Sequence, residues 1–150
     1  MDTLEQKTPV HILLVEDSPE DIELTIEAMK SNGLNTVINV VTDGVQALKY
    51  LRKIDGYENK ITPDLIMLDL NLPRKDGREV LAEIKMDEEL RRIPVIVLTT
   101  SRAESDILTC YSQYANCYVT KPVDFDNFLK IAKVIEDFWI HTVRLPKMHG

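Results

Sequence analysis

The stretch from His11 to Asp21 reads HILLVEDSPED and contains both parts of a strand-to-helix unit. Its first six residues are almost continuously apolar, which is typical of a parallel strand covered on both faces of a sheet. Ser18 follows at an N-cap position, with Pro19 at the first helical position and acidic residues in the first turn. The stretch therefore predicts a buried strand over 11–16 and a helix that starts at Ser18.

The same alternation continues along the chain on both sides of a polar loop over 56–63. Apolar runs predict further strands at residues 37–41, 65–70, 94–100 and 117–120. Helical spacing of apolar residues predicts helices that cover residues 45–51, 77–90, 103–114 and 124–141. This strict alternation predicts an α/β fold with a doubly wound, five-stranded parallel sheet, in which ligands bind at the carboxyl ends of the strands.

Composition narrows the classes of partner. The net charge of −7 would repel a phosphate backbone, so we expect no nucleic-acid partner. No apolar run approaches the roughly 20 residues needed to cross a bilayer, so we expect no membrane role. Residues 1–9 lack the apolar core of a secretory signal, and Cys110 and Cys117 form no CxxC pair. These features favour a cytoplasmic protein.

Charged and hydroxyl residues fall at the predicted strand ends. Glu16 and Asp17 end the first strand, Asp69 ends the third, Thr99 ends the fourth and Lys121 follows the fifth. Because the carboxyl ends of the strands converge on one edge of such a sheet, we expect these side chains to share one pocket.

The three acids of this pocket favour metal-assisted phosphoryl chemistry. Carboxylates this close repel one another, so either they hold protons more tightly than usual or a cation neutralises them. An all-oxygen site of this kind suits Mg²⁺. A carboxylate beside Mg²⁺ can attack phosphorus to give an aspartyl phosphate, with the metal and Lys121 neutralising the transition-state charge.

The constellation resembles the receiver domains of two-component response regulators of the chemotaxis-regulator type, over about residues 10–141. The family's acidic pair corresponds to Glu16 and Asp17, its phosphoacceptor to Asp69, its switch hydroxyl to Thr99 and its lysine to Lys121. The resemblance implies a flavodoxin-like fold with strand order 2-1-3-4-5. It also implies a phosphoacceptor protein rather than an enzyme.

Further roles are implied by the same resemblance. The backbone carbonyl of Asn71 would complete the metal site formed by Asp17 and Asp69, with Glu16 acting through a water molecule. Pro73 and Gly77 would shape the turn after the acceptor, and the peptide between Lys121 and Pro122 would be cis.

Tyr118 occupies the position of the family's aromatic switch residue. On phosphorylation Thr99 would move toward the phosphoryl group and Tyr118 would turn inward. The surface formed by the predicted helix over 103–114, the strand over 117–120 and the helix over 124–141 would then change. Thr100 replaces the small alanine common in the family, which bears on how the phosphoryl group and Tyr118 are accommodated.

Several longer segments look like the small response regulators that partner cyanobacterial phytochrome histidine kinases. They are the loop over 57–63, DLNLPRKDGREVLAEIK at 69–85, LTTS at 98–101 and FWIHTVRLP at 138–146. This similarity implies a light-regulated histidine kinase as the phosphoryl donor.

The predicted last helix is more apolar than packing on the sheet requires. Beyond its sheet-facing side it carries a second stripe formed by Ile131, Val134 and Phe138. We expect this stripe to form a homodimer that phosphorylation strengthens. The alternative is that the tail over 143–150 folds back over the stripe. We therefore expect a leader over 1–9, a receiver domain over 10–142, a short tail and no output domain.

Two other functions could use a pocket of this kind. A phosphohydrolase with an aspartyl-phosphate intermediate would need a second acid two positions after the nucleophile, where this chain has Asn71. A pseudo-receiver that binds partners without phosphorylation would not need the complete set of pocket residues.

Overall fold

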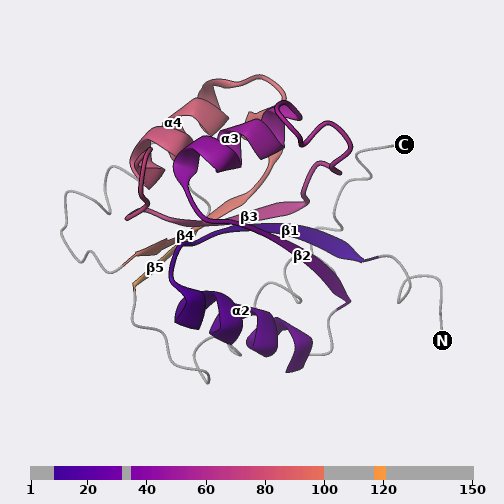
Figure 1. Cartoon of the computed structure of the whole chain (residues 1–150), viewed down its shortest axis with the longest axis vertical. Helices are drawn as coiled ribbons and strands as arrows, with labels where there is room; N and C mark the ends of the chain where they lie inside the picture. Colours follow the sequence, from indigo (N-terminus) through magenta and orange to yellow (C-terminus); the bar gives the residue numbers. More distant parts are fainter. Residues whose placement is uncertain (1–8, 32–34, 100–116, 121–150) are drawn as a thin grey trace.

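The computed structural model describes residues 9–31, 35–99 and 117–120, and strands alternate with helices through these ranges (Figure 1). The elements are β1 Val10–Val15, α2 Pro19–Ser31, β2 Thr36–Val41, α3 Gly44–Arg52, β3 Leu65–Asp69, α4 Gly77–Met86, the 3₁₀ helix η1 Leu90–Arg92, β4 Val95–Thr99 and β5 Cys117–Thr120.

The strands form one parallel sheet in the order β2-β1-β3-β4-β5. This confirms the predicted fold class and strand order. The register sets Val15 of β1 beside Val41 of β2 and Leu68 of β3, and Asp69 beside Leu98 of β4. The carboxyl ends of these four strands therefore lie level with one another, at the edge where the predicted pocket residues should meet.

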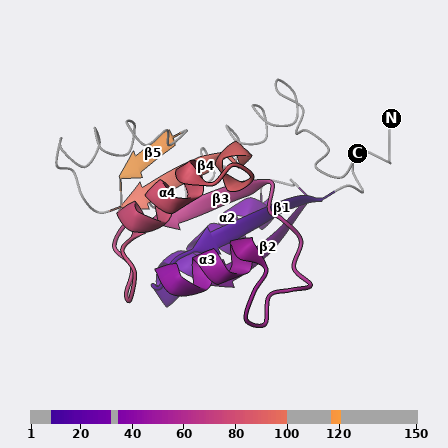
Figure 2. The ribbon, with the colours of Figure 1, turned by 90° about the horizontal axis from the view of Figure 1, so that it is seen from above.

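Helices cover both faces of the sheet. α2 lies on one face, and α3 and α4 lie next to each other on the other (Figures 1 and 2). Because side chains alternate along a strand, each central strand contributes to two apolar layers. Leu13 and Leu68 pack in the layer with α3 and α4, whereas Leu14 and Met67 pack in the layer with α2. Burial on both faces explains why these strands have almost continuous apolar sequences.

The helix ends follow from local hydrogen bonds. Ser18 caps α2 as predicted, because its hydroxyl oxygen accepts the amide of Asp21 at 3.3 Å. The helix predicted over 77–90 is too long, since α4 ends at Met86. Asp87 adopts an extended backbone, and its carboxylate accepts the amides of Glu89 at 2.9 Å and Leu90 at 3.1 Å. These bonds end one helix and start the 3₁₀ turn of η1.

The predicted loop between α3 and β3 is present and packs back on α3. The Tyr57 hydroxyl donates a 2.6 Å hydrogen bond to Oε1 of Gln46, and its ring lies 5.4 Å from that of Tyr50. Burial, and to a smaller extent the neighbouring Tyr57, raises the pKa of the Tyr50 hydroxyl.

Among the described residues, no helix is long and apolar enough to span a membrane.

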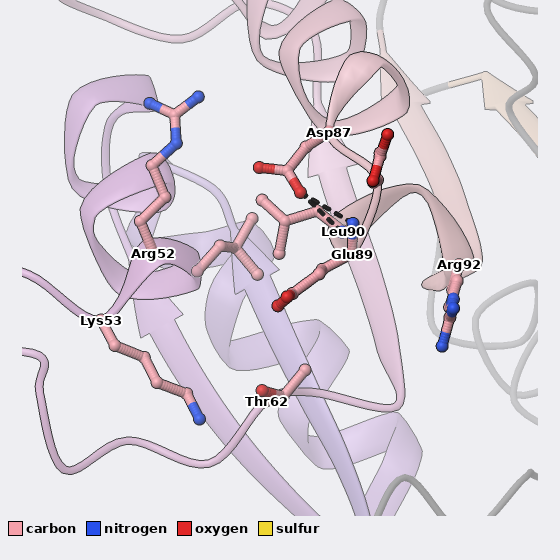
Figure 3. Close-up of a pocket in the computed structure, with 9 residues that line it drawn as sticks. Arg52, Lys53, Thr62, Asp87, Glu89, Leu90 and Arg92 are labelled. Carbon is pink, nitrogen blue, oxygen red and sulfur yellow. Dashed lines mark hydrogen bonds between the residues drawn. The ribbon is translucent and has the colours of Figure 1, made fainter.

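An open hollow lies at the amino edge of the sheet, where α3 ends and the segments before β3 and β4 meet (Figure 3). Charged side chains of both signs surround two leucines in this hollow. The lining residues are Leu51, Arg52, Lys53, Thr62, Asp87, Glu88, Glu89, Leu90 and Arg92.

Candidate metal centre at the carboxyl edge

The carboxyl edge of the sheet brings together Glu16, Asp17 and Asp69. One carboxylate oxygen from each lies within 4.8 Å of the others. Glu16 and Asp17 follow β1, and Asp69 is the last residue of the adjacent β3. Glu16 is 1% exposed and Asp69 is 4% exposed, whereas Asp17 is open to solvent. The predicted convergence of the three acids is therefore present, with two buried carboxylates and one at the surface.

Backbone amides orient the two buried carboxylates. The amide of Ser18 donates to Oε2 of Glu16 at 3.2 Å, and the amide of Asn71 donates to Oδ1 of Asp69 at 3.0 Å. In both cases the donor lies two residues further along the chain, where the backbone leaves its strand. These bonds offset part of the cost of burying the carboxylates and restrict their orientation.

This donor set fits a hard divalent cation. Three carboxylates offer oxygen ligands only, and their negative charges repel one another unless a cation lies between them. Mg²⁺ and Mn²⁺ both accept such oxygen ligands, and Mg²⁺ is commonly held by one or two carboxylates together with water. The exposed position of Asp17 leaves one side of the cluster open to solvent.

Gly77 lets α4 start directly against the end of β3. A Cβ at this position would lie 2.3 Å from the carbonyl oxygen of Asp69 and 2.6 Å from Cα of Leu70. The Gly77 amide also donates to the Leu70 carbonyl at 2.9 Å. The contact needs a residue without a Cβ, which agrees with the expected role of Gly77 in the turn after Asp69.

The loop over 71–76 is joined to α3 and α4 by ion pairs. Nη1 of Arg74 lies 3.4 Å from Oδ2 of Asp43, and Nζ of Lys75 lies 2.5 Å from Oε2 of Glu83. Arg52 contacts the other oxygen of Glu83 at 3.1 Å. Lys75, with a smaller contribution from Arg52, holds the pKa of the Glu83 carboxyl below its usual range.

The other predicted site residues are described to different extents. Thr99 ends β4 beside Thr120, and Tyr118 lies beside Val97 of β4, so both are at the expected strand positions. The roles of these two residues, and that of the Asn71 carbonyl, stay predictions. Five further predicted residues lie outside the described residues, namely Lys121, Pro122, Ile131, Val134 and Phe138.

Residues 12–133 match the family described as the response regulator receiver domain. The chain belongs to this family. Response regulator Rcp1 of Synechocystis sp. is 47% identical to this receiver over 142 residues, which cover 95% of this chain and 97% of Rcp1. The probable methanogenesis regulatory protein FilR2 of Methanothrix harundinacea is 40% identical over 145 residues, covering 97% of this chain and 93% of FilR2.

Solved structures give the same assignment. The crystal structure of the phosphorylated cyanobacterial phytochrome response regulator RcpA has a TM-score of 0.85 and 49% identity, covering 93% of this chain and 99% of RcpA. The crystal structure of the Mn²⁺-bound form of Rcp1 has a TM-score of 0.83 and 48% identity, and the match covers 92% of this chain and 99% of Rcp1. The predicted receiver family and fold are confirmed. Receiver domains bind Mg²⁺ at an acidic pocket, and this receiver has such a pocket at Glu16, Asp17 and Asp69.

Sequence reasoning missed the residues of this receiver that contact the loop after Asp69. Asp43 and Gly44 lie between the predicted strand over 37–41 and the predicted helix over 45–51, and the sequence assigns no role to Arg74 or Lys75. The Asp-Gly pair before a helix is a signal for an N-cap, and Asp43 does cap α3 by accepting the amide of Gln46 at 2.8 Å. No local sequence pattern predicts that Asp43 and Gly44 contact the loop over 71–76.

Proposed function

We propose that Asp69 accepts a phosphoryl group from the phosphohistidine of a sensor histidine kinase, in the presence of Mg²⁺. The observation that supports this most is the position of Asp69, whose carboxylate is buried at the end of a central strand within 4.8 Å of two other carboxylates. Asp17, Asp69 and the carbonyl of Asn71 would hold the metal, and Glu16 would act through a water molecule.

The reaction is a displacement at phosphorus. A carboxylate oxygen of Asp69 forms a bond to phosphorus while the bond from phosphorus to the histidine nitrogen breaks, and that nitrogen keeps the electron pair. When bound, the metal neutralises the charge on the phosphoryl oxygens. The backbone amide of Asn71, whose nitrogen lies 3.0 Å from Oδ1 of Asp69, holds the nucleophile in place. Lys121 and Thr99 would contact the transferred group from β5 and β4.

The phosphoryl group would act as a switch. Thr99 would move to hydrogen-bond the phosphoryl group and Tyr118 would turn inward. This change would alter the surface formed by residues 103–141, including the stripe of Ile131, Val134 and Phe138, and strengthen a homodimer. Sedimentation of the protein with and without an acyl-phosphate donor tests this; a monomer in both samples at tens of micromolar would contradict it.

We further propose that the kinase is of the phytochrome type and that the transfer takes place in the cytoplasm. The likeness of this chain to Rcp1 and to RcpA supports a phytochrome-type donor. FilR2, which is 40% identical, is named as a probable methanogenesis regulatory protein, so a direct transfer assay with purified kinases tests the phytochrome-type donor. Faster transfer from a phytochrome kinase than from an unrelated histidine kinase is the expected result.

One assay tests the acceptor role. The protein is incubated with Mg²⁺ and acetyl phosphate and then analysed by intact mass, before and after treatment with hydroxylamine. We expect one hydroxylamine-labile phosphoryl group per chain, which Asp69→Asn abolishes. Asp87→Asn is the matched control, because Asp87 accepts an amide in the same local pattern at the opposite edge of the sheet. Many turnovers on a substrate other than the acyl-phosphate donor would favour a hydrolase, and absence of an adduct would favour a pseudo-receiver.

A further inference from the structure

The loop over 71–76 carries the amide that contacts Asp69, and its backbone is strained. Arg74 has a φ of 67°, in the left-handed region that residues with a Cβ seldom adopt. The amide of Lys75 donates to the carbonyl of Pro73 at 2.7 Å, so the chain reverses within three residues. Backbone of this shape persists only where surrounding contacts hold it.

Two glycines bring other backbone segments against this loop. A Cβ on Gly44, the first residue of α3, would lie 2.2 Å from the carbonyl oxygen of Lys75. Gly77 closes the other end of the loop against Asp69. The loop therefore lies between the start of α3 and the start of α4, and a small shift at Lys75 has no free space on the side of α3.

Arg74 and Lys75 extend to anchored carboxylates on two different helices. Arg74 pairs with Asp43, which is 8% exposed and whose other oxygen caps α3. Lys75 pairs with Glu83 of α4, whose second oxygen is held by Arg52 of α3. Asp43 is fixed by its cap of α3, and Glu83 lies within α4, so each ion pair connects the loop to a helix.

We propose that Lys75 is a positioning residue for the metal and phosphoacceptor site, and that its ion pair with Glu83 holds the loop so that the Asn71 amide stays against Asp69. The inference rests on the proposed function. Arg74 supports the same loop conformation through Asp43. Neither side chain is proposed to contact the metal; both act through the backbone between Asn71 and Asp76.

The direction in which Lys75→Met changes the Kd for Mg²⁺ distinguishes a positioning role of Lys75 from a purely electrostatic effect of its charge. Lys75→Met removes a positive charge, and through-space electrostatics alone would strengthen the binding of a divalent cation at the acidic edge. If Lys75 positions the loop, its loss instead weakens the binding of the cation. We expect the Kd for Mg²⁺ to rise about 5-fold, below the range of about 10- to 100-fold typical for groups that contact a metal ligand directly.

The experiment is a calorimetric titration of the full chain with Mg²⁺, for the wild type, Lys75→Met and Lys75→Arg. Arginine can pair with Glu83, so Lys75→Arg should restore a Kd near that of the wild type. The matched control is Arg52→Met, which removes the partner of Glu83 on α3 and should change the Kd less than about 2-fold, because this pair does not involve the loop and is open to solvent. The amide resonance of Asn71 should shift in Lys75→Met and return in Lys75→Arg.

Several outcomes would overturn the inference. A Kd for Lys75→Met equal to or below that of the wild type would do so, as would an equal rise in Arg52→Met. If Lys75→Met does not fold, Glu83→Gln tests the same pair, and an unchanged Kd there contradicts the proposal. Failure of the wild type to bind Mg²⁺ would overturn the proposed function as well, whereas normal wild-type binding with unaffected variants overturns the positioning role alone.

Discussion

Asp69 at the carboxyl edge of the sheet and Asp87 at the amino edge make the same local hydrogen bond. In each, Oδ1 accepts the amide of the residue two positions later, at 3.0 Å from Asn71 and at 2.9 Å from Glu89. Asp69 is 4% exposed and lies with two other carboxylates. Asp87 instead starts a 3₁₀ turn beside a hollow that also contains basic side chains (Figure 3).

This difference shows that local geometry does not identify a functional carboxylate. The acids that line the hollow at the amino edge lie near Arg52, Lys53 and Arg92. Charges of both signs are therefore present there, and solvent screens them. At the carboxyl edge, parallel strands bring carboxylates of one sign into a partly buried site, where a cation stabilises them. Burial and convergence, both tertiary properties, separate the two edges.

The largest expected effect comes from filling the space between Asp69 and α4. Gly77→Ala places a Cβ against backbone atoms that cannot rotate away, so we expect it to lower the free energy of unfolding by about 3 kcal/mol. Gly56→Ala is the control: Gly56 has a φ of 101° but open space around it, so about 1 kcal/mol is expected. Urea unfolding measures both; equal losses would contradict the close-contact argument.

The next effect concerns the metal. Asp17→Asn removes one carboxylate from the carboxyl edge, and we expect the Kd for Mg²⁺ to rise by about 10-fold or more, equivalent to about 1.4 kcal/mol. Because Asp17 is exposed, the variant should fold normally. Asp87→Asn, at the opposite edge, should leave the Kd unchanged. Similar Kd values for both variants would mean that the acidic cluster is not the binding site.

The smallest expected effect is pH-dependent and belongs to the amino edge. The amides of Leu90 and Glu89 hold the pKa of the Asp87 carboxyl below its usual value of 3.8. A carboxyl with a lowered pKa stabilises the fold above its unfolded pKa, and this contribution is lost as pH falls through the folded pKa. Asp87→Ala removes the side chain that accepts these two amides, and because the group is screened by solvent we expect a cost of about 0.5 kcal/mol at pH 7.

The difference in free energy of unfolding between the wild type and Asp87→Ala should shrink as pH falls below 3.8, the usual pKa of this carboxyl. Urea unfolding of wild type and Asp87→Ala at neutral pH and at the lowest pH where both remain folded measures this. A difference that stays constant across that range would show that the charge of Asp87 does not contribute.

Most of the fold and the three acids could be predicted from sequence, because the signals are local. A strand buried on both faces must be apolar almost throughout, and Ser18 caps the helix that follows within three residues. Chain order and the rule for doubly wound sheets then place Glu16, Asp17 and Asp69 at one edge. The early end of α4 was missed because Asp87 competes with the helix for backbone amides.

By itself, the sequence determined the alternation of strands and helices and the chemistry available at the strand ends. Only the tertiary structure decided that Glu16 and Asp69 are buried while Asp17 is exposed, and which residues contact the loop after Asp69. Arg74 pairs with Asp43, 31 positions earlier, and Gly44 contacts the backbone of Lys75. Such contacts depend on how helices pack across the sheet, and packing places residues together that no local pattern of the chain relates.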